Sequence, residues 1–338
     1  MGYLLSIAIT SYKRINELER CINSIDCSYP DEVEIIISED CSPLKNEISH
    51  MVSAIMKKSK FSIRFNSNPI NLGYDCNLGK LISLSEAKYI MFMSDDDMLY
   101  PGALDEIIIC LRKAKNEGVF FSPYHNVKSN EYVRKYNESH YIPKSKRSAQ
   151  KYIYNAILFS GLIFRRDYIN NISSEEFKNL NYFQVYLFCI TLIKYGGCYF
   201  NTITVKCVDD GENAYGISSS SGGNSILANR KSVISNLEFN KGLFKVIKYV
   251  DRDMNSKVFN AFQKQYSLHA YSGLSIARVS GIKYYNEYWR TLKGLDIRLY
   301  PIVHIYYILL LLGGTKVTNT LLAIFKYAYF KLLRKRVI

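Results

Sequence analysis

The sequence lacks several patterns that would assign it to a familiar functional class. Its eight cysteines contain no C-x-x-C pair and no zinc-type spacing, which argues against a structural zinc site. No G-x-G-x-x-G follows the first apolar run and no G-x-x-x-x-G-K-[ST] occurs, so neither a dinucleotide fingerprint nor a P-loop is present. No motif of a nucleic-acid reader occurs either, so nucleic acid is not an expected partner.

Two further absences concern membranes and secretion. The strongly apolar run at residues 300–312 is shorter than the roughly 20 residues that cross a bilayer. No secretory signal opens the chain, since Met1 and Gly2 lead directly into a strand-like segment. With cysteines such as Cys110 and Cys189 in apolar surroundings, we expect a reduced, cytoplasmic setting.

The basic charge of the chain is concentrated in its last third. The whole sequence carries 44 Lys and Arg against 30 Asp and Glu, but residues 243–338 hold 16 of the basic residues and only 4 of the acidic ones. The hydrophobic content of 48% is ordinary for a folded protein, which argues against disorder. The excess of basic residues in the last third of the chain indicates that this part binds an anionic partner.

The first 115 residues alternate between apolar runs and amphipathic segments. We expect strands at residues 4–10, 33–38, 61–66 and 89–93, and helices at 16–24, 46–57, 74–85 and 103–115. Alternation at this spacing predicts a mainly parallel sheet covered by helices, whose ligands bind beyond the carboxyl ends of the strands. The four strand ends carry residues 10–14, Glu39 and Asp40, residues 68–73, and residues 95–97. Four polar ends on one edge favour a nucleotide site.

The last of these ends, Asp95-Asp96-Asp97, is the most informative feature. Three adjacent carboxylates after a buried strand repel one another and are most simply compensated by a cation. Mg²⁺ and Mn²⁺ prefer oxygen ligands, and Mg²⁺ commonly takes one or two carboxylates plus substrate phosphates. The alternative is an acidic helix start, which the helix dipole also favours.

Taken together, these segments resemble the family 2 glycosyltransferases of the GT-A fold. The opening LLSIAITSYKR is similar to the family's first strand and turn, and IIISEDCSP to its acidic base-binding segment. Residues 68–104 resemble the stretch that runs into the family's D-x-D motif. The likeness covers residues 4–111 well and continues more weakly to about residue 208.

The resemblance implies inverting transfer of a sugar from a nucleoside diphosphate sugar with the help of Mn²⁺ or Mg²⁺. It places the metal on Asp95 and Asp97, with Asp97 the stronger candidate. The donor-binding residues that it implies are Thr10, Tyr12, Arg14, Glu39, Asp40, Asn68, Asn71, Gly73, Asn77, Asp95 and Asp96.

Two positions depart from the family pattern. The usual arginine before Asn77 is Cys76, so one phosphate contact is missing. The usual acidic pair near the start of a later helix is replaced by Gln184 and Val185, neither of which accepts a proton near neutral pH.

We therefore take Glu176 as the candidate catalytic base. Glu175 and Glu176 also suit a plain helix start after two serines. Asp209, Asp210 and Glu212 are further acids nearby.

Two other segments have two interpretations each. Residues 160–166 resemble the family strand that lines the acceptor side, so Arg165 or Arg166 either binds an anionic acceptor or the diphosphate, or is solvated. Residues 209–225 are rich in Gly and Ser and form either a lid over the donor or a linker.

From residue 226 onward the pattern is helical. We expect a GT-A catalytic domain over 1–225 and a helical region over 226–338. The tail Leu321–Ile338 combines an apolar helical face with Lys326, Lys331, Arg334 and Lys335, which is typical of a helix on an anionic membrane surface. A helix buried against the domain or a second copy is the alternative.

The sequence thus predicts a bacterial glycosyltransferase, peripheral on the cytoplasmic face of the membrane, that acts on a lipid-linked or growing surface glycan. The competing interpretations are a nucleotidyltransferase and a glycosyltransferase-like protein that binds a nucleotide sugar without turning it over.

Overall fold

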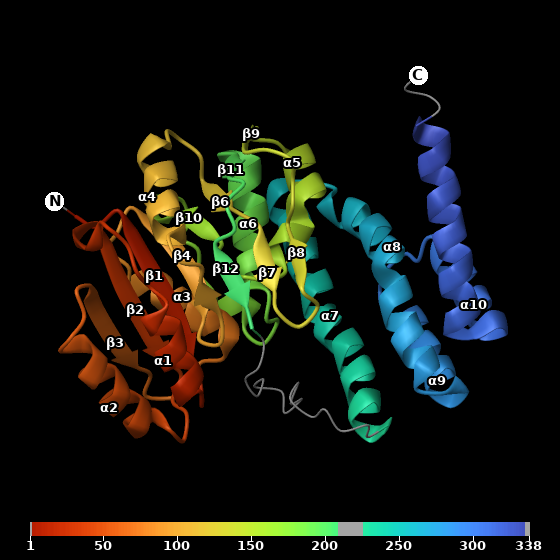
Figure 1. The fold of residues 1–338 in the computed structure, drawn as a ribbon, viewed down its shortest axis with the longest axis horizontal. Coiled ribbons are helices and arrows are strands. Elements are labelled where there is room, and N and C mark those ends of the chain that lie inside the picture. Colours follow the sequence, from red (N-terminus) through yellow and green to blue (C-terminus); the bar gives the residue numbers. More distant parts are fainter. Residues whose placement is uncertain (1, 209–225, 335–338) are drawn as a thin grey trace. The chain divides into compact units, whose positions relative to one another are not determined.

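The computed structural model describes residues 2–208 and 226–334, with side chains described up to residue 324 except at 226–236, 238 and 239. The described chain forms two compact units (Figure 1). The first unit comprises Met1–Gly222 and Gly242–Val258, and the second comprises Gly223–Lys241 and Phe259–Ile338.

The first unit is built on an eight-stranded sheet in the order β3-β2-β1-β4-β10-β6-β11-β9. Strands β1 (Leu5–Ser11), β2 (Val33–Glu39), β3 (Ser62–Ser67) and β4 (Tyr89–Ser94) are mutually parallel. Antiparallel β10 (Ile163–Arg165) joins β4 to β6 (Val119–Phe121), and β11 (Gly197–Tyr199) and β9 (His140–Ile142) complete the sheet. The expected mainly parallel core of four strands is confirmed.

A smaller sheet has the order β5-β12-β7-β8. Its strands are β5 (Met98–Leu99), β12 (Val205–Cys207), β7 (Tyr124–Asn126) and β8 (Glu131–Val133). Because β5 follows the three aspartates directly and pairs with β12, this sheet fixes the polypeptide on the far side of the acidic turn.

The helices of the first unit lie between and beside these strands. They are α1 (Ile15–Asn23), α2 (Lys45–Met56), α3 (Tyr74–Leu84), α4 (Ala103–Lys113), α5 (Lys146–Tyr152) and α6 (Phe183–Lys194), with short 3₁₀ turns at Pro30–Glu32, Ile153–Ala156, Arg166–Tyr168 and Glu175–Phe177. The four helices expected up to residue 115 are confirmed to within two residues at each end.

The reason for this arrangement is visible in β1 and α1. Every residue of β1 except Thr10 is buried, as expected for a central parallel strand that is covered on both faces. In α1, the buried residues Leu18, Cys21 and Ile22 recur at helical spacing, so one face packs on the sheet and the other meets solvent.

The second unit is helical, as the sequence pattern indicates. Helix α7 (Ile226–Met254) contributes to both units, and α8 (Val258–Val279), α9 (Ile282–Lys293) and α10 (Pro301–Arg334) follow. Gly273 allows α8 and α9 to approach closely, because a Cβ there would lie 2.1 Å from the hydroxyl oxygen of Tyr288. The Lys and Arg residues of the tail from 325 onward have side chains outside the described residues.

Candidate donor-binding site

The sheet register brings the expected polar strand ends to one edge. Thr10 of β1 lies opposite Ser38 of β2 and Ser94 of β4, and Ser67 of β3 lies opposite Glu39. The segments that follow these residues therefore start side by side, which is where ligands bind in open α/β sheets.

A cavity of about 510 Å³ opens at this edge. Eight of the residues expected to bind the donor line it: Thr10, Tyr12, Arg14, Asp40, Asn71, Gly73, Asn77 and Asp95. Glu39, Asn68, Asp96, Asp97 and Glu176 do not line it. Most of the residues predicted from the sequence thus line one cavity, and the five others do not contribute to its lining.

A hydrogen-bonded network around Asp40 shapes one wall. The Asp40 carboxylate accepts from the amide of Asn68 at 2.9 Å and from the backbone N–H groups of Leu72 at 2.8 Å and Gly73 at 2.9 Å. Gly73 precedes α3 with φ +79°, a backbone conformation that suits glycine. Asn77 donates to the carbonyl of Ser38 at 3.1 Å. Asn68 therefore acts behind the wall, by holding Asp40.

Glu39 is fully buried and turned away from the cavity. One carboxylate oxygen accepts from the backbone N–H of Ser42 at 2.7 Å. The other oxygen has no hydrogen-bond partner among the described residues.

Arg14 joins two of the three aspartates. Its guanidinium lies 2.8 Å from the Asp95 carboxylate and 2.9 Å from that of Asp96. Burial raises the pKa of Asp95 to about 7, although Arg14 and the backbone N–H of Tyr12 favour its charged form. The three aspartates lie in a turn between β4 and β5, and α4 begins only at Ala103, so the helix-start interpretation is wrong.

Asp97 is 2% exposed and has different neighbours. Its carboxylate accepts hydrogen bonds from the Ser160 and Cys207 side chains and from the backbone N–H of Val208, the last at 3.3 Å. Burial and the nearby Asp96 charge raise its pKa to about 7. In the described part of the chain, no group of three or more His, Cys, Asp or Glu is arranged to hold a metal by itself.

A buried arginine that the sequence interpretation missed lies behind this turn. Arg134 donates to the backbone carbonyl of Ser160 at 3.3 Å, and its guanidinium stacks 4.9 Å from the centre of the Tyr124 ring. Burial lowers its pKa to about 10, while the nearby Asp97 carboxylate opposes that shift. Arg134 thus supports the segment that donates to Asp97.

The candidate base Glu176 lies in an ion-pair cluster. Its carboxylate contacts Arg252 of α7 through two hydrogen bonds of 2.6 and 3.0 Å, and these bonds lower its pKa. Arg252 also pairs with Asp253, which accepts from the hydroxyl of Tyr186 at 2.7 Å. Both partners of the Glu176–Arg252 pair are about half exposed. The pair therefore fastens the 3₁₀ turn at Glu175–Phe177 to α7.

Gln184, one of the two residues at the position of the family's usual acidic pair, is also hydrogen-bonded within the fold. Gln184 of α6 accepts from the hydroxyl of Tyr74 at 3.0 Å, and its amide donates to the carbonyls of Ala156 and Ile157. Arg165 and Arg166 donate to the carbonyls of Lys115 and Ala87, and neither lines the cavity. Asp209, Asp210 and Glu212, and the whole segment interpreted as lid or linker, lie outside the described residues.

Sequence interpretation missed part of the cavity lining, namely Tyr74, Phe159, Asn179 and Asn181. Asn179 and Asn181 have φ of 64° and 62°, a conformation that asparagine tolerates better than most residues. The sequence signal that could have pointed to this part of the lining is the pair Asn179 and Asn181 just before α6.

Asp75 holds the segment that carries Asn181 in place. Its fully buried carboxylate accepts from the backbone N–H groups of four consecutive residues, 180–183, at 2.7 to 3.0 Å. Those groups precede or open α6, so Asp75 of α3 caps a different helix. Burial raises its pKa, and the four N–H groups oppose that shift.

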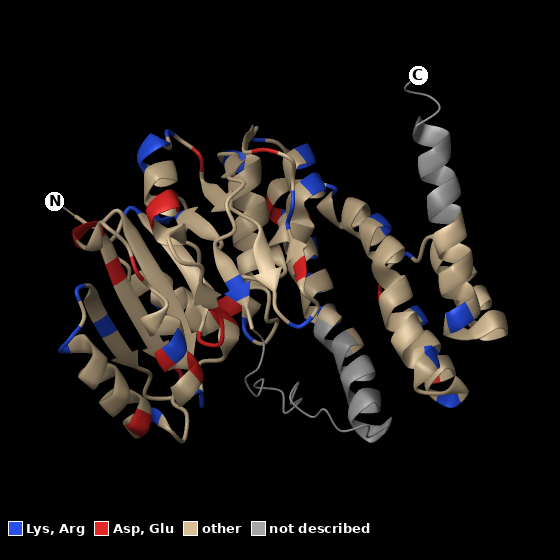
Figure 2. Cartoon of the chain, in the orientation of Figure 1, with Lys and Arg blue, Asp and Glu red and all other residues tan. Residues whose placement is uncertain are grey.

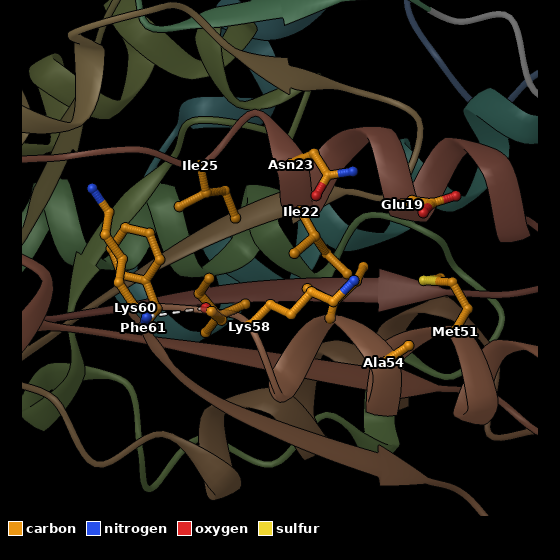
Figure 3. A pocket seen from close by; sticks show the side chains of 12 residues that line it. Glu19, Ile22, Asn23, Ile25, Met51, Ala54, Lys58, Lys60 and Phe61 are labelled. Atoms are coloured by element: carbon orange, nitrogen blue, oxygen red, sulfur yellow. Dashed lines mark hydrogen bonds between the residues drawn. The ribbon is translucent and has the colours of Figure 1, made fainter.

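Another cavity, of about 550 Å³, lies between α1 and α2, away from the strand ends (Figure 3). Ile22, Ile25 and Phe61 form apolar parts of its lining, and Lys58 and Lys60 lie beside them. Lys60 is paired with Asp26 at 2.5 Å. None of the expected site residues lines this cavity.

Comparison with known proteins agrees with the fold. Residues 6–172 match the family model described as glycosyl transferase family 2. Abequosyltransferase RfbV of Salmonella typhimurium is 31% identical over 103 residues, and this match covers 30% of either chain.

Two solved structures are similar in fold. Residues 1–349 of S. aureus TarS give a TM-score of 0.52 at 12% identity, with 92% of each chain covered. The mannosyltransferase PcManGT of Pyrobaculum calidifontis, solved with GDP-Man and Mn²⁺, gives a TM-score of 0.52 at 11% identity and covers 92% of this chain and 86% of its own.

The family match and the similar solved structures identify a glycosyltransferase domain of the GT-A fold. Through residues 6–172 the chain belongs to glycosyltransferase family 2.

Proposed function

We propose that this protein transfers a sugar, with inversion, from a nucleoside diphosphate sugar onto a lipid-linked or growing glycan of a bacterial surface polysaccharide. The observation that carries the proposal is the 510 Å³ cavity at the strand ends, lined by eight of the residues that the family resemblance implies for the donor site. The similarity to an abequosyltransferase supports a surface-glycan acceptor.

The cavity offers distinct groups to the parts of such a donor. Asp40, Asn71 and Asn77 present oxygens and amides that suit hydrogen bonding to a base and ribose. Arg14 presents a guanidinium that matches the oxygens of a diphosphate, and it is already held in place by Asp95 and Asp96. Arg14 thus supplies a cation to the cavity in a chain that has Cys76 where the family usually has an arginine.

The acidic turn fits a divalent cation that is shared with the donor. Asp97 is the stronger ligand candidate, because Arg14 forms direct ion pairs with Asp95 and Asp96, whereas the described contacts of Asp97 are hydrogen bonds and only a longer-range attraction to Arg134. A bound Mn²⁺ or Mg²⁺ would stabilise the charge that develops on the departing nucleoside diphosphate.

We infer that Glu176 has a structural role and that the base lies elsewhere. Its two bonds to Arg252 leave it paired within the α7 cluster and outside the cavity lining. The two carboxylates in that lining, Asp40 and Asp95, each accept several hydrogen bonds. This arrangement also favours the alternative of a protein that binds a nucleotide sugar without transferring it.

The substitution Glu176→Gln tests this inference. We expect it to change the rate of sugar transfer by less than about threefold and leave the thermal midpoint nearly unchanged, because exposed ion pairs contribute little. Loss of a general base would instead lower the rate by about 10²- to 10⁴-fold. A loss of that size in a folded variant would restore Glu176 as the base.

A donor panel tests the function itself. Purified protein is incubated with Mn²⁺ and a series of nucleotide sugars, with and without lipid-linked acceptors, and release of nucleoside diphosphate is followed. Metal-dependent release with one donor supports transfer. Binding of a donor without release supports the binding-only alternative, and release of pyrophosphate from a nucleoside triphosphate supports a nucleotidyltransferase.

A lipid-linked acceptor implies a protein that works at the membrane, and we propose a peripheral position on the cytoplasmic face. The basic tail Leu321–Ile338 is one candidate attachment. Removing it should shift the protein from the membrane to the soluble fraction at moderate salt while donor hydrolysis is retained. Unchanged fractionation would show that the tail is structural.

A further inference from the structure

Helix α10 presents a continuous apolar face to solvent ahead of the basic tail. Pro301, Ile305, Ile308 and Leu312 recur at helical spacing, so they share one face. Ile305 is 50%, Ile308 51% and Leu312 81% exposed. No charged residue occurs between Arg298 and Lys316. Exposed apolar side chains gathered in this way mark an interaction surface.

The opposite face of the same helix is fixed within the second unit. Val303 and Leu310 are fully buried. The ring of Trp289 in α9 stacks 4.2 Å from that of Tyr307, whose backbone carbonyl accepts from the hydroxyl of Tyr285 at 2.7 Å. The helix is therefore held in one orientation, and its apolar stripe is a fixed surface.

The length of α10 would allow a membrane span, since residues 301–324 are long and apolar enough and only 11% of the most apolar window is buried. The contacts of Tyr271 argue against a straight span. Its ring lies 5.3 Å from that of Tyr306, and its hydroxyl donates to Asn319. Positions 306 and 319 would be about 20 Å apart along a straight helix, so the chain doubles back between them.

The reversal occurs at Gly314, which has φ 62° and ψ −173° and interrupts the helix. The limb before it, residues 301–313, is about 20 Å long, whereas the hydrocarbon core of a bilayer is about 30 Å thick. Arg278 of α8 donates to the carbonyl of Leu310 at 2.9 Å, which would place a guanidinium deep in the bilayer if this limb crossed it. The limb suits the surface of a membrane rather than its interior.

Charge identifies the surface that this face fits. After Asp296 the sequence contains seven Lys and Arg and no Asp or Glu. In Figure 2 the described part of α10 correspondingly carries no acidic residue. A second copy of the chain would bring two basic regions together, whereas an anionic leaflet attracts them and accepts the apolar stripe.

We propose that the first limb of α10 lies in the headgroup boundary of an anionic membrane, with Ile305, Ile308 and Leu312 inserted among the acyl chains. The proposal deepens the membrane attachment proposed above, and it assigns that attachment to a folded surface separate from the tail. Its test measures lipid binding alone, so failure of sugar transfer would leave it unaffected.

The test compares the full chain with the double variant Ile305→Glu/Ile308→Glu in cosedimentation with vesicles of phosphatidylcholine, with and without phosphatidylglycerol. We expect wild type to bind the anionic vesicles and the double variant to bind at least about tenfold more weakly, because two carboxylates replace inserted apolar groups. Ile70→Glu is the matched control, since Ile70 is 63% exposed in the first unit, and it should bind as wild type does.

Two measurements keep the comparison specific. Trp289 is the sole tryptophan and stacks on Tyr307 of α10, so an unchanged emission maximum shows that α9 and α10 still pack in the double variant. Light scattering after size exclusion reports the oligomeric state without lipid. Equal vesicle binding by the wild type and the double variant overturns the proposal. It is also overturned if the wild type is a dimer, the double variant is a monomer, and both bind vesicles equally.

A chain that ends at Thr320 separates the folded surface from the tail. We expect it to retain part of the vesicle binding and to lose that part when Ile305→Glu/Ile308→Glu is added. Alkaline carbonate should release the bound full chain from vesicles, because it lies on the bilayer. Retention in the pellet would instead show a spanning helix and overturn the proposed position.

Discussion

Asp97→Asn should lower metal-dependent release of nucleoside diphosphate by at least about 10²-fold, the size of effect seen when one group that stabilises leaving-group charge is removed. The substitution preserves the shape of the side chain and its ability to accept from the backbone N–H of Val208. It removes only the charge that we propose to bind the cation. Steady-state rates at several Mn²⁺ concentrations measure the effect.

The same variant should fold as well as the wild type. Burial holds the pKa of Asp97 in the folded protein above its value in the unfolded chain. The free energy of unfolding of the wild type therefore falls as the pH rises from about 4 to about 7. A neutral side chain avoids that penalty. In the presence of a chelator, we therefore expect its thermal midpoint at pH 7 to be no lower than that of wild type, and the difference to grow between pH 4 and pH 7.

Glu106→Ala serves as the control, because Glu106 is an exposed carboxylate in the first turn of α4. It should leave both the rate and the thermal midpoint within experimental scatter. Turnover of the Asp97→Asn protein within about tenfold of wild type would contradict the metal assignment.

Asp75→Ala should destabilise the first unit by about 3–5 kcal/mol. It removes the carboxylate that accepts from the N–H groups of residues 180–183, and the groups of the buried residues Tyr182 and Phe183 are then left without a partner. Such a loss corresponds to a fall of about 10 °C in the thermal midpoint of a unit of this size. Chemical and thermal unfolding followed by circular dichroism give both values.

Glu47→Ala is the matched control for Asp75, since Glu47 is also an acid in the first turn of a helix but is exposed. Its effect should remain within about 0.5 kcal/mol. If Asp75→Ala lowers stability no more than Glu47→Ala does, the cap on α6 is unimportant. Because Asn179 and Asn181 line the cavity beside that cap, donor affinity should fall together with stability.

The N-terminal sheet could be predicted because its signals are local. Continuous apolar runs such as residues 5–9 form strands wherever helices cover both faces, and the helical spacing of Leu18, Cys21 and Ile22 fixes the buried face of α1. Parallel strands end at a common edge. The polar residues that follow them therefore had to meet, and most of the predicted donor-binding residues do line one cavity.

The acidic turn shows where local reasoning reaches its limit. From residue type alone, Asp95, Asp96 and Asp97 were three like carboxylates that needed compensation, and only the family resemblance ranked Asp97 first as a metal ligand. The fold distinguishes them, because Arg14 from the β1–α1 connection neutralises two of them and the third is buried beside Val208. The partner of each carboxylate depends on residues roughly 80 or more positions away, and no spacing rule encodes such contacts.

The same limit explains Glu176 and Asp75. Glu176 had the chemistry of a base, but its pairing with Arg252 depends on how α7 packs. Asp75 looked like an ordinary first-turn acid of α3, yet it caps α6, more than 100 residues further along the chain. Both assignments depend on long-range packing.

By itself, the sequence determined the α/β order of the catalytic domain, the polar edge of its sheet and the basic character of the last third of the chain. Only the tertiary structure decided which aspartate meets Arg14, which acid is tied up in an ion pair, and which face of α10 is left bare. Local patterns fix elements because backbone hydrogen bonding and burial repeat along the chain, whereas the partner of a single side chain is set by contacts between distant segments.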